Sequence, residues 1–274
     1  MSSVRPIVVK IGGEVAGSGE APLLAADLRV LVDGGARVAI VHGGGPQATE
    51  LSRRLGLETR QVAGRRVTDA ATLDVMKMVL AGKINVDLCA ALTGAGVRAV
   101  GLHGASGLTV RAVRRPPKVY AGGGAEPVDL GLVGDVTGFN LELLETLWGA
   151  GYVPVIACLG ADDKGGVYNI NADIVGNQLA AALHAERLFL VTSAPGVLRD
   201  VNDPSSRLPE LTCAQAHAAI ADGVVTGGMI PKLEEAMAVI DQGVGAIHIL
   251  GKLGAGDLVR AVRQPGSVGT TLLP

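Results

Sequence analysis

The stretch at residues 38–46, V-A-I-V-H-G-G-G-P, constrains the fold more than any other part of the sequence. Its apolar run is typical of a buried strand, and three glycines and Pro46, which can open a helix, follow at once. Glycines at the start of a helix let a ligand approach the main chain, where N–H groups and the helix dipole favour negative charge. The sequence therefore predicts an anion at this turn, with a strand-to-helix connection that binds nothing as the alternative.

Strand and helix patterns alternate along most of the chain. Expected strands cover residues 6–11, 38–41, 97–102, 152–158, 187–192 and 245–250. Expected helices cover residues 22–32, 46–55, 70–80, 84–92, 140–148, 173–183, 214–221 and 229–240, with Asp69 and Thr212 as caps. This order predicts an α/β fold with a mostly parallel sheet that helices cover on both faces. Ligands bind such sheets beyond the carboxyl ends of the strands, where both Lys10 and the glycine turn lie.

Two other features concern the organisation of the chain. Residues 108–136 are irregular, and their prolines and the glycines at 122–124 predict hairpins with a mobile tip. No low-complexity linker divides the chain, and we expect a lobe boundary within residues 171–183. The sequence therefore predicts an N-terminal lobe at residues 1–180 and a C-terminal lobe at residues 181–274.

The composition limits the classes of protein. Although 48% of the 274 residues are hydrophobic, no apolar run reaches membrane-spanning length, and the N-terminus lacks the apolar block of a signal peptide. A net charge of -2 and the absence of a basic tract argue against a nucleic-acid partner. Three cysteines, odd in number and far apart, predict neither a disulfide framework nor a zinc site and fit the reducing cytoplasm. Four cations are interpreted as a solvated loop: Arg111, Arg114, Arg115 and Lys118.

Several common α/β classes lose support because their motifs are absent. The sequence contains no Walker A pattern, Rossmann fingerprint or nucleophile elbow, which argues against P-loop NTPases, dinucleotide enzymes and α/β-hydrolases. The five histidines are scattered, and we assign none of them a catalytic role.

Two lysines stand where a positive charge needs a partner. Lys10 ends a buried strand in V-V-K-I-G-G, where a lone ammonium is costly unless it reaches solvent or meets an anion. Lys232, in G-G-M-I-P-K, lies at the start of a helix, where the dipole disfavours a cation unless a negative ligand offsets it. An anion near both explains the two positions. For each, a lysine whose stem extends to solvent is the alternative.

Further polar residues suit the binding of a carboxylate. The segment Y-N-I-N-A-D at residues 168–173 places Asn169 and Asn171 on one face of an extended strand, so that their amides can bind a carboxylate. Asp173, at a helix start, either holds the lysines in position or caps its helix. Arg66, in G-R-R-V-T-D, offers a planar fork for a carboxylate, with a surface salt bridge of little energetic worth as the alternative.

Five motifs together resemble the amino acid kinase family. They are V-V-K-I-G-G at residues 8–13, V-H-G-G-G at 41–45, R-V-T-D at 66–69, Y-N-I-N-A-D at 168–173 and G-G-M-I-P-K at 227–232. Within the family, the resemblance is to members that phosphorylate N-acetyl-L-glutamate in arginine biosynthesis. It implies an αβα sandwich whose N-terminal lobe binds N-acetyl-L-glutamate and forms a homodimer and whose C-terminal lobe binds ATP with Mg²⁺.

The resemblance also implies roles for the residues that carry charge or main-chain contacts. Lys10 and Lys232 would stabilise the transferring phosphoryl group, and Asp173 would orient both lysines. Gly44 and Gly45 would supply main-chain contacts to the substrate and the phosphoryl group. Transfer to a carboxylate needs no protein base, because a carboxylate is already ionised at neutral pH.

Substrate contacts follow from the same resemblance. Arg66 and Asn169 would bind the carboxylates of acetylglutamate, with Asn171 in a supporting place. The implied ATP contacts are Gly12, Gly13, Ser193, Ala194, Pro195, Gly196, Val197, Leu198, Val224, Val225 and Thr226. No protein side chain is implied as a metal ligand, because ATP would hold the magnesium.

Three features depart from the family pattern. Ser193 stands where members usually have an aspartate near the nucleotide, and His103 replaces a serine in G-L-H-G. Only residues 1–5 precede the first expected strand, whereas arginine-inhibited members carry an additional N-terminal helix that links dimers into a hexamer. We therefore expect a homodimer that arginine does not inhibit.

Two other functions stay open at this point. A related kinase would act on glutamate or aminoadipate held on a carrier protein, although R-V-T-D matches the subgroup for free acetylglutamate more closely. A non-catalytic amino-acid sensor would keep the fold, but it has no need for the charges of Lys10, Asp173 and Lys232. The sequence also leaves open whether a nitrogen-signalling protein is a partner.

Overall fold

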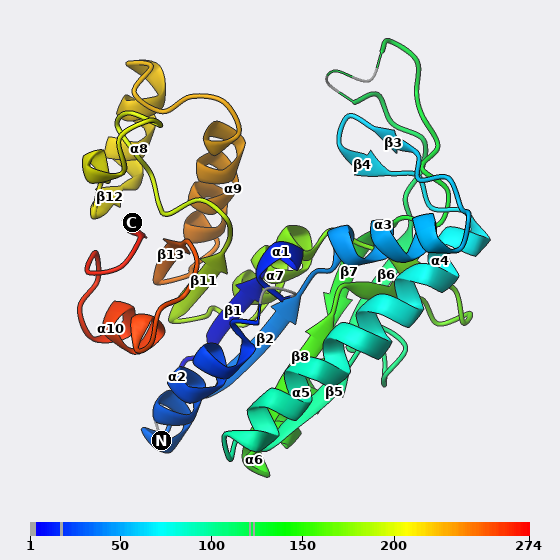
Figure 1. Cartoon of the computed structure of the whole chain (residues 1–274), viewed down its shortest axis with the longest axis horizontal. Coiled ribbons are helices and arrows are strands. Elements are labelled where there is room, and N and C mark those ends of the chain that lie inside the picture. The colour runs from blue at the N-terminus through cyan, green and yellow to red at the C-terminus, as the bar shows by residue number, and fades with distance from the viewer. Residues whose placement is uncertain (1–3, 17–18, 121, 123) are drawn as a thin grey trace.

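The computed structural model describes residues 4–16, 19–120, 122 and 124–274 of the 274-residue chain. At their centre these residues form an eight-stranded sheet in the order β12-β14-β13-β11-β1-β2-β8-β5 (Figure 1). Its strands are β1 (Ile7–Ile11), β2 (Val38–His42), β5 (Ala99–Leu102), β8 (Val153–Ala157), β11 (Arg187–Val191), β12 (Glu210–Thr212), β13 (Ala246–Leu250) and β14 (Thr270–Leu273). Within the described sheet, neighbouring strands are parallel except β13 and β14, which confirms the expected α/β fold with a mostly parallel sheet.

Strand β1 lies in the middle of the sheet, between β2 and β11. Its sequence, I-V-V-K-I, is buried throughout, which is the pattern of a parallel strand covered on both faces. The register aligns Ile11 with both His42 and Val191. The carboxyl ends of β1 and β2 are therefore level, and the glycine turns that follow them lie side by side.

Helices pack on the sheet in two layers (Figure 1). In one layer α2 lies between α10 and α5, and in the other α9 lies between α7 and α8, with α7 against β1, β2 and β11. The helices are α1 (Gly13–Ala16), α2 (Ala21–Asp33), α3 (Gly45–Arg54), α4 (Ala70–Met76), α5 (Asn85–Gly94), α6 (Leu141–Gly149), α7 (Ala172–Ala182), α8 (Cys213–Ala221), α9 (Met229–Asp241) and α10 (Asp257–Arg263). Leu24, Ala25 and Leu28 form the buried face of α2, as their helical spacing predicts.

The helical pattern at residues 70–92 forms one continuous run rather than the two separate helices expected. Asp69 caps it, as predicted, by accepting a hydrogen bond of 2.7 Å from the Thr72 N–H. The run continues from α4 through a π-helical segment, η1 (Lys77–Ile84), into α5. Leu80 and Ile84 of η1 are buried, and this packing outweighs the low helix propensity of Gly82, near which the sequence predicted a break.

A second sheet and a short hairpin lie beside α3 and α4 (Figure 1). The sheet has the order β10-β9-β6-β7, and its strands are β6 (Val110–Arg114), β7 (Gly134–Phe139), β9 (Leu159–Ala161) and β10 (Val167–Asn169); the hairpin joins β3 (Gln61–Val62) to β4 (Arg65–Arg66). β6 and β7 are antiparallel, as the hairpin pattern at residues 108–136 predicts. Residues 121 and 123 lie outside the described residues, so the mobile tip expected at 122–124 stays a prediction.

The sequence did not predict the C-terminal elements β12, α10 and β14. They contain three, seven and four residues, which is too short for a clear periodic pattern. The cap of α10 comes from α2, where buried Asp27 accepts hydrogen bonds from the N–H groups of Gly256 (2.9 Å) and Leu258 (2.8 Å). A contact between residues so far apart in the chain cannot be found from local patterns.

The central sheet is continuous across the expected lobe boundary. Pairing of β1 with β11 joins strands of residues 1–180 to strands of residues 181–274, and the boundary itself stays a prediction. Cys89, Cys158 and Cys213 are free thiols. Within the described part of the chain, no helix is long and apolar enough to cross a membrane.

Candidate active site

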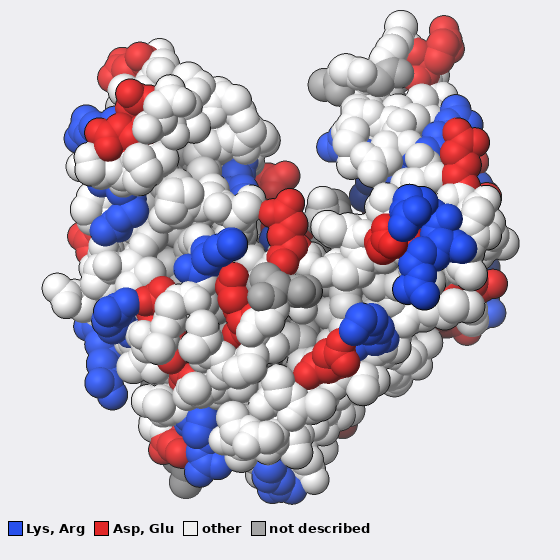
Figure 2. All heavy atoms as spheres, viewed as in Figure 1, with Lys and Arg blue, Asp and Glu red and all other residues white. Residues whose placement is uncertain are grey.

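A cleft of about 810 Å³ opens beyond the carboxyl ends of β1, β2 and β11. Figure 2 shows the molecule hollowed between the part that carries α8 and α9 and the part that carries the β3–β4 hairpin. The residues predicted from the sequence that line this central cleft are Lys10, Gly12, Gly13, Gly44, Gly45, Arg66, Asn169, Asn171, Asp173, Ser193 and Lys232. Residues from distant parts of the chain therefore meet in one site.

Two glycine turns form the floor of the central cleft. The Gly12 N–H donates to the Val191 carbonyl (3.0 Å), and the Gly43 N–H donates to the Ile11 carbonyl (3.0 Å). A Cβ added to Gly13 would lie 3.0 Å from the backbone nitrogen of Gly44, which is closer than real Cβ contacts normally come. The two turns are thus in direct contact, and only glycine at position 13 permits this.

Lys10 and Asp173 form an ion pair in the central cleft. Lys10 is only 5% exposed, and its Nζ lies 2.5 Å from Oδ1 of Asp173. The cap of α7 is Asn171, whose Oδ1 accepts a hydrogen bond of 2.8 Å from the Asp173 N–H. Because Asn171 takes the capping role, the carboxylate of Asp173 is available to Lys10, and the alternative of Asp173 as the cap was wrong. Gly176 gives the lysine room, since a Cβ there would lie 3.0 Å from Cβ of Lys10.

Lys232 enters the central cleft from the first turn of α9. Its Nζ donates a hydrogen bond of 3.2 Å to Oγ1 of Thr192, which directly follows β11. Partial burial lowers the pKa of Lys232, the charge of Asp173 opposes this shift, and the charge of Lys10 adds to it. The charges of Lys10 and Asp173 therefore act on Lys232, and the two lysines line the same cleft.

Arg66 and Asn169 stand on the opposite side, at the β3–β4 hairpin and β10. Nη2 of Arg66 donates to Oγ1 of Thr49 (2.6 Å) and to the Gly45 carbonyl (3.0 Å). Within the described residues Arg66 has no ion-pair partner, and burial lowers its pKa. A half-buried guanidinium that contacts only neutral groups favours an anionic ligand over the surface salt bridge considered from the sequence. Asn169 donates from Nδ2 to Oγ1 of Thr68 (3.1 Å).

Arg115 corrects an interpretation made from the sequence. It lines the central cleft instead of belonging to a solvated loop, and its Nε donates to Oδ1 of Asp135 at 2.8 Å. The ion pair with Asp135 draws the arginine inward, and these residues are 20 positions apart in the chain. Arg65 also lines the cleft, with its guanidinium carbon 4.8 Å from the centre of the Tyr120 ring.

Sequence reasoning missed three further residues of the cleft. Thr192 binds Lys232, and Glu235 lies three residues after Lys232 on the same side of α9. Burial, then the charge of Asp173, raises the pKa of Glu235. Cys158 also lines the cleft, where burial raises the pKa of its thiol to about 12. The helical spacing of Lys232 and Glu235 was the one signal available for these residues.

Most of the implied nucleotide residues lie away from the central cleft. Of those at 193–198 and 224–226, only Ser193 is among the described residues that line it. Val197 is buried, and its N–H donates to Oγ1 of Thr270 (2.8 Å). Val225 is also buried, and its N–H donates to the Ala219 carbonyl (3.0 Å). The nucleotide roles of these segments stay predictions.

The fold, and the presence of Lys10 and Lys232 in one cleft, indicate a single class of protein. The sequence matches the amino acid kinase family over residues 5–251, and the chain belongs to this family. The resemblance found from the five motifs is thereby confirmed.

Two curated relatives with high identity to this chain are named acetylglutamate kinase. The acetylglutamate kinase of Sorangium cellulosum (strain So ce56) is 62% identical over 273 residues, which cover 100% of this chain and 96% of the relative. The acetylglutamate kinase of Anaeromyxobacter dehalogenans (strain 2CP-C) is 64% identical over 269 residues, which cover 98% and 100%.

Solved structures show the same fold. N-acetylglutamate synthase from Neisseria gonorrhoeae, complexed with coenzyme A and N-acetyl-glutamate, superposes with a TM-score of 0.82 at 24% identity. The match covers 98% of this chain and 59% of the synthase. Giardia carbamate kinase gives a TM-score of 0.70 at 17% identity, over 99% of both chains.

Proposed function

We propose that the chain transfers the γ-phosphoryl group of ATP to the γ-carboxylate of N-acetyl-L-glutamate, as in arginine biosynthesis. A carboxylate oxygen forms a bond to the γ-phosphorus, the bond from this phosphorus to the β–γ bridging oxygen breaks, and ADP leaves with N-acetyl-L-glutamyl 5-phosphate. No proton has to be removed, because the acceptor is already ionised at neutral pH. The observation that carries the proposal is that Lys10, Asp173 and Lys232 line one cleft in a chain 62% identical to a named acetylglutamate kinase.

The chemical task of this site is to align two anions and to offset charge on the migrating group. Lys10 and Lys232 supply positive charge, and Asp173 positions Lys10 through the 2.5 Å ion pair. The glycine turns add main-chain N–H groups without side chains that would keep the phosphoryl group at a distance. In our proposal Gly44 and Gly45 contact the phosphoryl group and the acceptor.

The acceptor is proposed to lie on the side of the β3–β4 hairpin. Arg66 and Asn169 line the central cleft there and would bind the carboxylates of N-acetyl-L-glutamate. The free positive charge of Arg66 suits a carboxylate held by two parallel hydrogen bonds. Asn171, which caps α7, keeps a supporting place.

MgATP is proposed as the second substrate, on the side of α9. We propose that the magnesium is bound through the phosphates of ATP, as the family resemblance implies. We place the triphosphate at Gly12, Gly13, Ser193 and Lys232, which line the central cleft. The rest of the nucleotide would extend toward residues 194–198 and 224–226.

We also propose that the protein forms a homodimer and is located in the cytoplasm. β5 ends the central sheet and packs against α5, on which the side chain of Val86 is 60% exposed. Apolar side chains beside an open sheet edge favour contact with a second copy. Three free cysteines fit a reducing compartment. Sedimentation equilibrium tests the dimer, and a monomer at micromolar concentration would contradict it.

The direct test of the function is an assay with ATP, Mg²⁺, N-acetyl-L-glutamate and hydroxylamine, which converts an acyl phosphate to a coloured hydroxamate. We expect hydroxamate and ADP in equal amounts, both dependent on N-acetyl-L-glutamate. Product that requires glutamate or aminoadipate on a carrier protein would replace the proposed acceptor. No product with any of these acceptors would favour a sensor.

A further inference from the structure

Two histidines are completely buried, so that one can serve as the control for substitutions of the other. His42 ends β2 immediately before the glycine turn, and His248 lies on β13; each is 0% exposed. Burial lowers the pKa of His42 to about 4 and, with the charge of Arg187, the pKa of His248 to about 3. Both rings are therefore neutral at neutral pH, and a neutral ring has one donor nitrogen and one acceptor nitrogen.

The contacts of His42 fix which nitrogen carries the proton. Nδ2 of Asn85 lies 2.9 Å from the Val155 carbonyl, which can only accept, so this atom is the amide nitrogen. The same Nδ2 lies 3.0 Å from Nε2 of His42, which therefore accepts the second amide hydrogen. The ring proton is then on Nδ1, which donates to the Gly43 carbonyl at 3.1 Å.

This hydrogen bond sets the orientation of one peptide in the glycine turn. In a trans peptide the carbonyl of Gly43 and the N–H of Gly44 point in opposite directions. Holding the carbonyl toward the buried ring of His42 therefore directs the Gly44 N–H away from it. Gly44 lines the central cleft, and within the described residues its N–H has no acceptor.

A Gly–Gly peptide needs such support. Without Cβ atoms on either side, it can turn over at little steric cost. The turned-over peptide would present a carbonyl oxygen to an anionic ligand in place of an N–H donor, and this reverses the sign of the interaction. Leu80 and Ile84 of η1 restrict the turn from the other side, because a Cβ on Gly44 would overlap both side chains.

We propose that His42 is a positioning residue for phosphoryl transfer, which keeps the Gly44 N–H directed at the migrating phosphoryl group through its hydrogen bond to the Gly43 carbonyl. This inference rests on the function proposed above. Asn85, the first residue of α5, orients the ring, so the end of the π-helical segment and the glycine turn are joined through one side chain.

Two substitutions of His42 separate its two hydrogen bonds. An asparagine amide reaches the position of Nδ1, so His42→Asn keeps the donor to Gly43 and loses the acceptor for Asn85. A glutamine amide reaches the position of Nε2, so His42→Gln keeps the acceptor and loses the donor. We expect His42→Gln to lower kcat about tenfold or more, since a misdirected N–H acts like a lost oxyanion donor, with little change in either KM. His42→Asn should retain most of kcat although it loses stability.

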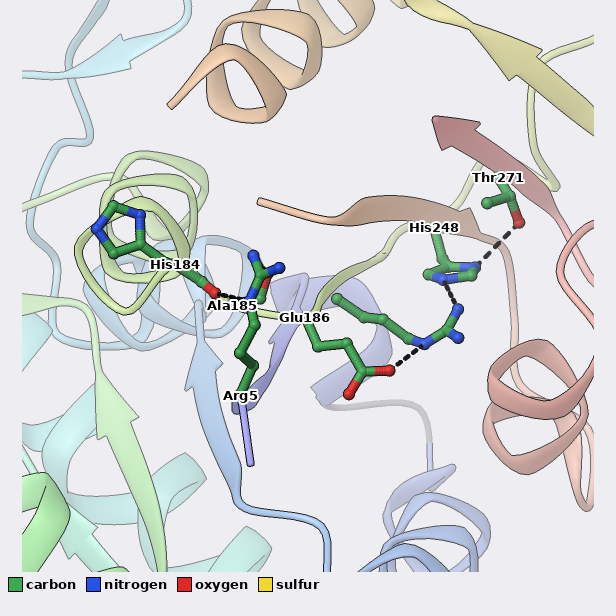
Figure 3. Close-up of polar contacts among 7 residues, drawn as sticks. Arg5, His184, Ala185, Glu186, His248 and Thr271 are labelled. Carbon is green, nitrogen blue, oxygen red and sulfur yellow. Dashed lines mark hydrogen bonds and ion pairs between the residues drawn. The ribbon is translucent and has the colours of Figure 1, made fainter. Parts of the chain in front are cut away.

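His248 supplies the control for burial alone. Its Nδ1 lies 3.0 Å from Oγ1 of Thr271 (Figure 3). Its Nε2 accepts from Nη1 of Arg187 (3.2 Å), and its ring stacks on Phe189. It does not line the central cleft. His248→Gln should therefore lower the melting temperature and leave kcat of the folded enzyme near the wild-type value.

Nitrogen NMR of the histidine rings tests the geometry without any assay. We expect the resonances of His42, assigned by comparison with His42→Asn, to show a proton on Nδ1. A proton on Nε2, an unchanged kcat in His42→Gln, or equal losses of kcat in both variants would each overturn the inference. If the wild-type protein forms no acyl phosphate, the proposed function fails and this inference with it. Normal wild-type activity with an unaffected His42→Gln variant rejects the role of His42 alone.

Discussion

The two sides of the central cleft differ in how completely the site is assembled. On the side of β1, β2 and the β3–β4 hairpin, the residues implied by the motifs all line the cleft. On the side of β11 and α9, only Ser193 and Lys232 do so. In the first group, Lys10 and the glycines lie at or directly after the ends of the buried strands β1 and β2, whereas most of the second group lies in connections that pack elsewhere. The difference indicates that the side proposed for the phosphoryl group and the acceptor is preformed, whereas residues 194–198 and 224–226, proposed to contact the rest of the nucleotide, do not line the cleft.

The largest expected effect concerns Lys10, on the preformed side. Lys10→Ala removes a cation from the migrating phosphoryl group, and we expect kcat to fall roughly a thousandfold, as for other lost phosphoryl-stabilising cations. ADP release with saturating substrates measures this. The matched control is Lys77→Ala, which breaks the exposed pair with Asp74 (3.1 Å) and should leave kcat unchanged. Near-normal turnover of Lys10→Ala would remove Lys10 from the mechanism.

Arg66 tests whether the preformed side binds the acceptor. Arg66→Ala leaves a substrate carboxylate without its charged partner, and we expect kcat/KM for N-acetyl-L-glutamate to fall about a hundredfold, in line with lost charged hydrogen bonds. The KM for ATP should stay within about twofold, because Arg66 and Lys232 lie on opposite sides of the cleft. A larger effect on ATP than on N-acetyl-L-glutamate would reverse our assignment of the two sides.

The alkaline pH profile tests Lys232, which lines the cleft on the side of β11 and α9. Because burial lowers the pKa of Lys232, its charge is lost at a lower pH than that of an ordinary lysine. We expect kcat/KM for ATP to fall about tenfold per pH unit above this pKa, since kcat/KM reports ionisation of the free protein and only the protonated form stabilises the phosphoryl group. In Lys232→Arg the charge persists, and the decrease should disappear. An identical alkaline decrease in both proteins would assign it to another group.

Substitution of the two adjacent glycines distinguishes packing from ligand contact. A Cβ on Gly44 overlaps Leu80 and Ile84, whereas a Cβ on Gly45 meets open space. Gly44→Ala should therefore lower the free energy of unfolding by about 1–3 kcal/mol, as overpacking does, and Gly45→Ala should leave it unchanged. Urea denaturation measures both values. No loss for Gly44→Ala, or an equal loss for Gly45→Ala, would contradict this difference in packing between the two positions.

The smallest expected effect concerns Thr226, which is assigned to the nucleotide on the side of β11 and α9. Thr226→Ala removes at most one hydrogen bond to the nucleotide, and we expect KM for ATP to rise about two- to tenfold. Initial rates at varied ATP concentration measure it. An unchanged KM would mean that the nucleotide does not reach residues 224–226, and the contrast between the two sides would then persist with ligand bound.

The sequence was most informative where function depends on strand ends. Lys10 and the glycines that follow β1 and β2 were found because an apolar run, a charge and a turn are local features. The role of Asn171 as the cap was not predicted, because Asp173 was the capping residue considered and both types of residue are suitable caps. Arg115, Thr192 and the short C-terminal strands depend on partners far away in the chain, which local patterns do not reveal. The π-helical segment exists because Leu80 and Ile84 pack in the core, and propensity at Gly82 predicted the opposite.

The continuous sheet beneath the cleft also determines how the two sides can move. Five residues of β1 pair with β11, so the halves of the molecule share a hydrogen-bonded base and no flexible linker joins them at that point. A rigid hinge rotation would have to break this pairing. Approach of α9 toward the β3–β4 hairpin that keeps this pairing would therefore use a change in the twist of the strands, spread as small dihedral adjustments over many residues, or a shift of these two elements on an unchanged sheet.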